Sequence, residues 1–134
     1  MTEKIEIGII GAGGNARAKH LPNFREIGGV DVLAVCNKHE ESTRAVAEEW
    51  DIPRTPSDWR EIIEMEDLDA VLIGTWPYLH CEASCAALRS GKHVLCEARM
   101  AMDATEARKM LRVLNSTDLV GQIVPSPLGL EVHD

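Results

Sequence analysis

Short apolar runs alternate along this chain with segments whose apolar residues recur at helical spacing. The apolar runs cover residues 5–10, 30–36, 69–74, 93–96 and 119–124. The segments between them have apolar residues three or four apart, which predicts helices. These helices are expected at 15–27, at 40–50, at 78–90 and after position 103. Strands that are apolar throughout and alternate with helices form a parallel sheet that is covered on both faces. The pattern therefore predicts a doubly wound parallel α/β sheet in a single αβα layered domain.

Local signals indicate where several helices begin. Pro22 lacks a backbone N–H, so it is expected to kink or restart the first helix. Thr55 is expected to cap a further helix, with a proline at the first helical position and Asp58 reaching back. Asp103 and Glu106 form a plausible capping pair ahead of the last helix.

The first apolar run ends in a glycine-rich turn, and a helical segment follows at once, as a dinucleotide-binding βαβ unit of a Rossmann fold requires. Gly11 allows a sharp turn off the strand, and Gly13 leaves bare backbone for a pyrophosphate. Ala16 is small enough for the helix to lie close to the sheet. The candidate pyrophosphate-binding residues are Gly11, Gly13, Gly14, Asn15 and Ala16. The motif alone is weak evidence for a cofactor site, because glycine turns of this kind also serve packing. The other loops are therefore needed to decide whether a cofactor binds.

Ligands of such a sheet lie over the carboxyl ends of its strands. After residues 30–36, where an acidic residue often holds the ribose hydroxyls, the chain has Asn37 and Lys38. These two side chains are suited to bond and neutralise a 2′-phosphate, which favours NADP over NAD. The alternative is that they form a solvated turn.

The loops after residues 69–74 and 93–96 supply further candidates. In the first loop they are Thr75, Trp76, Pro77 and His80, and in the second loop Glu97. An exposed aromatic ring there is suited to stack on a nicotinamide or a substrate, although a helix-capping role for this loop is the alternative. Glu97 is placed to bond ribose hydroxyls or to pair with Arg99. His20 and His93 are expected to be structural.

Composition narrows the possible partners. The chain has 14 basic and 22 acidic side chains and a net charge of −8, which argues against nucleic acid and anionic membranes. No run of 18 apolar residues and no signal peptide is visible, so a cytoplasmic location is expected. The four cysteines form no CxxC pair; they are expected to be buried packing residues, and no metal site is predicted.

From about Ile5 to Val124 the chain resembles the N-terminal domain of the glucose–fructose oxidoreductase / inositol dehydrogenase (Gfo/Idh/MocA) family. The resemblance rests on three stretches, which are residues 7–14, 75–80 and 91–97. It implies a domain that binds NAD or NADP in an oxidoreductase acting on hydroxyl groups of sugars and cyclitols. It also implies that the glycine turn holds pyrophosphate, while the loops after 69–74 and 93–96 flank the nicotinamide ribose.

Two motifs depart from the family's pattern. The usual Glu-Lys-Pro reads Glu97-Ala98-Arg99, which replaces a lysine that helps to position substrate and cofactor. The usual Thr-Pro-Asn reads Thr75-Trp76-Pro77, and its asparagine is absent. The catalytic residues are therefore left unassigned, and a non-catalytic NAD(P) sensor or regulatory domain stays open as an alternative. A second alternative is an adenosyl-methionine methyltransferase, whose first turn is also glycine-rich.

The resemblance also divides the chain. Residues 1–124 are assigned to the dinucleotide-binding domain, and 125–134 to a linker or the start of a missing substrate domain. Because hydride transfer needs a positioned small-molecule substrate as well as a cofactor, the 134 residues alone are expected to be inactive. The full-length protein is expected to be a homo-oligomer, and this chain a monomer or a weak dimer.

Overall fold

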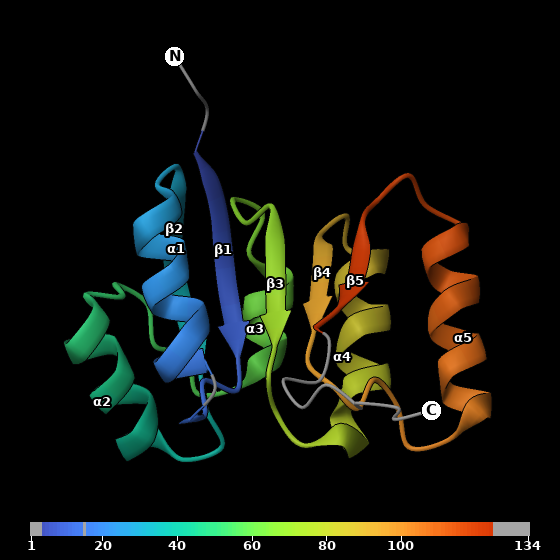
Figure 1. Cartoon of the computed structure of the whole chain (residues 1–134), viewed down its shortest axis with the longest axis horizontal. Helices are drawn as coiled ribbons and strands as arrows, with labels where there is room; N and C mark the ends of the chain where they lie inside the picture. Colours follow the sequence, from blue (N-terminus) through green and yellow to red (C-terminus); the bar gives the residue numbers. More distant parts are fainter. Residues whose placement is uncertain (1–3, 15, 125–134) are drawn as a thin grey trace, which may run out of the picture.

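The computed structural model describes residues 4–14 and 16–124, which form one parallel sheet between two layers of helices (Figure 1). The strands are β1 (Ile5–Ile10), β2 (Val30–Cys36), β3 (Ala70–Ile73), β4 (His93–Cys96) and β5 (Gly121–Ile123). Their order is β2-β1-β3-β4-β5, and every neighbouring pair is parallel. This arrangement confirms the predicted doubly wound fold. The strand order reverses direction beside β1, so a crevice is expected where β1 and β3 end.

Apolar side chains bury both faces of the sheet. The helical elements are a π-helix, η1 (Ala16–His20), and α1 (Leu21–Ile27), α2 (Glu40–Trp50), α3 (Trp59–Glu64), α4 (Pro77–Arg89) and α5 (Ala104–Asn115). On one face, α3, α4 and α5 pack on a cluster that includes Ile10, Ile73 and Met110. On the other face, α1 and α2 pack on a smaller cluster around Ile9 and Val46. Among the described residues, no helix is long and apolar enough to cross a membrane.

The first helical segment restarts as the proline predicts. It begins as the π-helix η1 and becomes α-helical only at Leu21, with Pro22 in the first turn of α1. A helix leaves its first backbone N–H groups without intrahelical acceptors, so a proline is tolerated there. A π-turn contains one more residue than an α-turn. The side chains that follow the glycine turn therefore point in other directions than they would in a regular α-helix.

The start of α3 corrects the sequence prediction. Asp58, not Thr55, is the N-cap: its carboxylate accepts a hydrogen bond from Arg60 N at 2.9 Å, and the Glu61 carboxylate accepts one from Asp58 N at 3.2 Å. The Thr55 prediction is wrong because the chain just before it is held extended on β2, where Arg54 N donates to the backbone of that strand. The last strand is also shorter than predicted, and residues 125–134 lie outside the described residues.

All four cysteines are buried, as the sequence analysis expects of packing residues. Burial raises the pKa of the Cys96 thiol to about 11, and burial is also the largest cause that raises the pKa of Cys81 to about 11. The pKa of Cys36 is raised for the same reason. Thiolates are the reactive form of cysteine, so these side chains are protected both sterically and by their protonation state.

We therefore expect the native protein to resist thiol reagents. At pH 8 a thiol with a pKa of about 11 is ionised in about one molecule in a thousand. In a colorimetric thiol assay, native protein should release almost no chromophore on the time scale in which protein unfolded in guanidinium reacts at all four cysteines. Rapid reaction of two or more cysteines without denaturant would contradict the buried arrangement.

Candidate functional site

A cavity of about 500 Å³ lies at the carboxyl edge of the sheet, where β1, β2 and β3 end. Its lining comes from the glycine turn, the loop after β2 with the start of α2, and the loop after β3. The lining residues are Gly11, Ala12, Gly13, Gly14, Arg17, Asn37, Lys38, Ser42, Val46, Gly74, Thr75 and Trp76. Its size is that of a small-molecule or cofactor site. The structure thus brings together most of the predicted residues from three loops.

The glycines of the site have two different roles. A Cβ on Gly11, which has a φ of +84°, would lie 2.6 Å from Thr75 N, and a Cβ on Gly74 would lie 2.6 Å from Gly11 O. The loops after β1 and β3 therefore meet backbone to backbone. In contrast, nothing lies within 4 Å of a Cβ built on Gly13 or Gly14. Those two residues present open backbone to the cavity, which is the cradle that a pyrophosphate group requires.

Asn37 lines the cavity, but its amide is already engaged. Its Oδ1 accepts a hydrogen bond from Ala12 N at 2.7 Å, and its Nδ2 donates to Ala12 O and to Ser42 Oγ, both at 3.3 Å. Its side chain therefore holds the glycine turn against the end of β2, and a bond from Asn37 to a 2′-phosphate stays a prediction. Lys38 is exposed and lines the same cavity, so it is the member of the pair that faces solvent.

Two polar lining residues were not identified from the sequence. Arg17 follows the glycine turn on η1, and its guanidinium forms an ion pair with Glu49 of α2 at the edge of the cavity. Ser42 lies in the first turn of α2. A basic residue directly after the last small residue of the glycine motif is the only sequence signal for Arg17, and Ser42 has none. Of the other motif residues, Ala16 is buried as expected, and Asn15 lies outside the described residues.

The loop after β3 combines the two roles that the sequence left open. Trp76 lines the cavity with 64% of its surface exposed. It is also the N-cap residue of α4, and Pro77 occupies the first turn of that helix. The proline thus has a helix-starting role, and it does not line the cavity. The exposed indole of Trp76 is free to contact a ligand. Thr75 also lines the cavity.

The expectation that His80 contacts a ligand also stays a prediction, and the ring has a structural role of its own. Its side chain is fully buried, and it does not line the cavity. Its Nδ1 lies 2.7 Å from Arg99 O, and its Nε2 lies 2.8 Å from Thr75 O. Because both ring nitrogens are occupied by backbone carbonyls, His80 joins the loop after β3 to the loop after β4. It thus connects two loops at the carboxyl edge of the sheet.

Glu97, at the end of β4, bonds His20 of η1 through His20 Nε2 and a Glu97 carboxylate oxygen. Both side chains are largely buried, and the His20 ring also stacks on Phe24 with centroids 6.4 Å apart. The expected alternative, a pair between Glu97 and Arg99, is not the interaction found. His20 was expected to be structural, and its bond to Glu97 links the last residue of η1 to the loop after β4.

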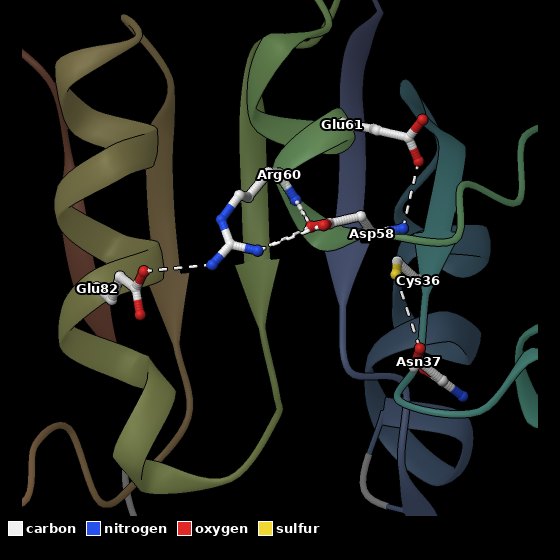
Figure 2. A network of polar contacts seen from close by, with 6 residues as sticks. All are labelled: Cys36, Asn37, Asp58, Arg60, Glu61 and Glu82. Carbon is white, nitrogen blue, oxygen red and sulfur yellow. Dashed lines mark hydrogen bonds and ion pairs between the residues drawn. The ribbon is translucent and has the colours of Figure 1, made fainter.

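A second cavity, of about 340 Å³, adjoins the first on the α3 side and shares Asn37, Lys38 and Thr75 with it. Figure 2 shows the polar network beside it, in which Arg60 lies between Asp58 at 3.3 Å and Glu82 at 3.7 Å. These side chains are exposed, so their ion pairs contribute little to stability. Among the described residues, no group of three or more metal-ligating side chains is arranged to hold a metal ion.

The fold, the open glycine cradle and the basic residues at the rim define the class: this is a nucleotide-binding Rossmann domain. The sequence model of a family described as an oxidoreductase family with an NAD-binding Rossmann fold matches residues 5–123. The chain therefore belongs to this family, which is the one named from the motifs. The match sets aside the methyltransferase alternative.

Named relatives and solved structures agree with this assignment. The chain is 38% identical over 104 residues to a 1,5-anhydro-D-fructose reductase of Ensifer adhaerens, covering 78% of this chain and 31% of the relative. It is 31% identical over 109 residues to an inositol 2-dehydrogenase of Klebsiella pneumoniae, covering 80% and 32%. A crystal structure of KijD10, a 3-ketoreductase from Actinomadura kijaniata in complex with TDP-benzene and NADP, superposes with a TM-score of 0.83 at 26% identity, covering 90% of this chain and 38% of that chain. The chain thus spans about a third of the length of these proteins.

The two glycine roles can be separated by substitution. Gly11→Ala and Gly74→Ala should each lower the free energy of unfolding by about 2 kcal/mol, because the new methyl group meets backbone atoms that cannot move aside. Gly13→Ala and Gly14→Ala serve as matched controls and should change it by less than about 0.5 kcal/mol. Urea unfolding followed by circular dichroism measures all four. Equal losses in the two pairs would contradict the assignment.

Proposed function

We propose that this chain is the cofactor-binding domain of an NADP-dependent oxidoreductase that acts on hydroxyl groups of sugar-like or cyclitol substrates. One observation carries the preference for NADP over NAD. The described lining of the 500 Å³ cavity contains no acidic residue and two basic ones, Lys38 and Arg17, of which Arg17 is paired with Glu49 of α2, although the whole chain has a net charge of −8. A carboxylate after β2 would hold ribose hydroxyls and repel a 2′-phosphate, whereas the exposed Lys38 ammonium attracts one.

The residues of the cavity suit the parts of such a cofactor. The open backbone of Gly13 and Gly14 is placed to receive the pyrophosphate, and Lys38 with Ser42 is placed to hold the 2′-phosphate. Trp76 offers a flat surface for an aromatic ring. The nicotinamide, when bound, supplies hydride transfer at its C4. Glu97, oriented by His20, is the candidate group for the ribose at that end of the crevice.

The substrate class is proposed from the relatives. One of them is named for reduction of an anhydro sugar and another for oxidation of a cyclitol, and both substrates carry several hydroxyl groups. In each case the reaction exchanges a hydride and a proton between a carbinol and a carbonyl group. The proton-transfer residue stays unassigned on this chain. We propose that it lies, with the substrate pocket, in the part of the relatives that this chain does not span.

A second candidate function is a non-catalytic NAD(P)-binding sensor. The observation that favours it is Ala98, which stands where the family motif has a lysine that positions substrate and cofactor. A methyl group neither moves a proton nor bonds a hydroxyl. Arg99, one residue further on, is exposed and stays protonated at ordinary pH, so it does not replace the lysine in proton transfer. Both candidates require the same cofactor, and turnover by a full-length protein separates them.

Cofactor titration tests the proposal directly. Binding of NADPH and NADH to the 134-residue chain is measured by quenching of tryptophan fluorescence and by thermal unfolding. We expect the chain to bind NADPH more tightly than NADH. The Lys38→Asp variant should bind NADPH about 10- to 100-fold more weakly, which corresponds to the loss of one charge-assisted hydrogen bond. The same variant should bind NADH at least as well as the parent chain does.

Lys109→Asp is the matched control, because it makes the same change of charge on α5, outside the cavity. It should leave both affinities unchanged. An equal loss of NADPH affinity in the two lysine variants would show that the effect comes from the net charge of the chain and not from the position of Lys38. Tighter binding of NADH than of NADPH by the parent chain would overturn the NADP preference while leaving the family assignment intact.

A further inference from the structure

A third cavity, of about 210 Å³, lies beside β5, the last described strand at its edge of the sheet (Figure 1). It is bounded by β4 and β5 on one side and by α4 and α5 on the other. It shares no described lining residue with the 500 Å³ cavity, so what it holds is independent of the proposed function. Its lining is mainly aliphatic and sulfur-containing, with Ser84 and Gln122 as the polar residues.

The register of the sheet shows which of the two polar side chains belongs to the cavity. Gln122 is paired with Leu95, while Ile123 is paired with Cys96. Because successive side chains of a strand point to opposite faces, Gln122 and Leu95 face the side of the sheet away from α4 and α5. Leu95 accordingly packs against the smaller core cluster on that other face. Ser84 is therefore the polar side chain that meets the cavity.

The hydroxyl of Ser84 is buried without a strong partner. The residue lies on α4 with 2% of its surface exposed, and its Oγ has no nitrogen or oxygen partner among the described residues. A serine in a helix can donate to the carbonyl oxygen four residues earlier, but this bond is not formed. The Cys96 thiol lies beside the hydroxyl, and sulfur is a weak hydrogen-bonding group. A buried polar group in this state is unfavourable until another molecule bonds it.

Water is a poor occupant of this cavity. A buried water molecule is held by about two to four polar partners, whereas the lining side chains offer one hydroxyl. An unfilled apolar space also forfeits dispersion contacts along its walls. Apolar cavities of about 150 Å³ bind a benzene molecule, so a ligand of that size fits this cavity of about 210 Å³. None of the described lining side chains is charged, which argues against an ionic ligand.

We propose that this cavity is a second binding site, for a compact aromatic molecule that carries one hydroxyl group, as phenol does. The ring fills the apolar space, where the thioethers of Met100 and Met110 favour contact with an aromatic edge. The hydroxyl of the ligand bonds Ser84 Oγ, and either group can be the donor because each hydroxyl both donates and accepts. Val94 and Leu114 contribute aliphatic walls. The site thus takes an uncharged ligand at a position separate from the cofactor cavity.

Methyl NMR of the 134-residue chain locates the ligand. The methionine methyl groups are labelled with carbon-13, and phenol and toluene are titrated separately. Ring currents should shift the signals of Met100 and Met110, which line the cavity, and Met100→Leu and Met110→Leu assign them. Met102 is exposed and outside the lining, so its signal is the internal reference. Each probe should saturate with a Kd of about 1 mM, the range expected of a ligand with so few atoms.

Ser84→Ala tests the polar contact. Phenol and toluene have nearly the same shape and differ by a hydroxyl in place of a methyl group. The variant should bind phenol about 3- to 10-fold more weakly than the parent chain does, because it removes one hydrogen bond. It should bind toluene as tightly as the parent or more tightly, so the two ligands and two proteins form a double-mutant cycle. Ser90→Ala is the matched control, because Ser90 is exposed at the end of α4 and outside the cavity.

The possible results separate clearly, and none of them depends on a cofactor. Ser90→Ala should match the parent for both probes. If neither phenol nor toluene shifts the signals of Met100 and Met110, there is no ligand site at this edge of the sheet and the proposal is wrong. If Ser84→Ala changes the affinity for phenol and for toluene by the same factor, the hydroxyl of Ser84 does not recognise the ligand, which refutes the assigned ligand class.

Discussion

The contact on which the rest of this structure depends is the backbone-to-backbone approach of the loops after β1 and β3. At Gly11 and Gly74 there is no room for a Cβ, and each backbone occupies the space that the other's side chain would need. This approach brings the ends of the two central strands together at the point where the strand order reverses. The cavity lies beside that contact, where the loops after β1, β2 and β3 meet. A larger residue at either position would separate the loops and open the floor of the site.

Buried polar side chains then hold each loop in place from below. Asn37 bonds the backbone of Ala12, His80 bonds the carbonyls of two loops, and His20 bonds Glu97. These contacts are at least partly shielded from water, so leaving one partner unsatisfied would cost more than an exposed bond is worth. Exposed groups, such as the Lys38 ammonium, are left to meet a ligand. The site therefore separates residues that position the backbone from residues that face solvent.

This separation explains which site residues the sequence predicts and which it does not. The spacing of Gly11 and Gly13 after an apolar run predicts the open backbone of the glycine turn, because that geometry is local to a few residues. Asn37 also sits in the loop that sequence analysis selects, but its bond to Ala12 spans 25 positions in the chain. A local pattern carries no information on whether a polar side chain at a strand end turns toward the cavity or back toward a neighbouring loop. His80 was assigned to the ligand for the same reason.

The sequence by itself determined the alternation of strands and helices, the parallel sheet and the edge at which ligands bind, because these follow from hydrophobic periodicity and glycine spacing. It also identified the family. Only the tertiary structure decided that Asp58 caps α3 after the contact of Arg54 with β2, that η1 is a π-helix, and that His20 bonds Glu97. Those outcomes depend on hydrogen bonds between segments distant in the chain. Such bonds form only once the sheet has assembled.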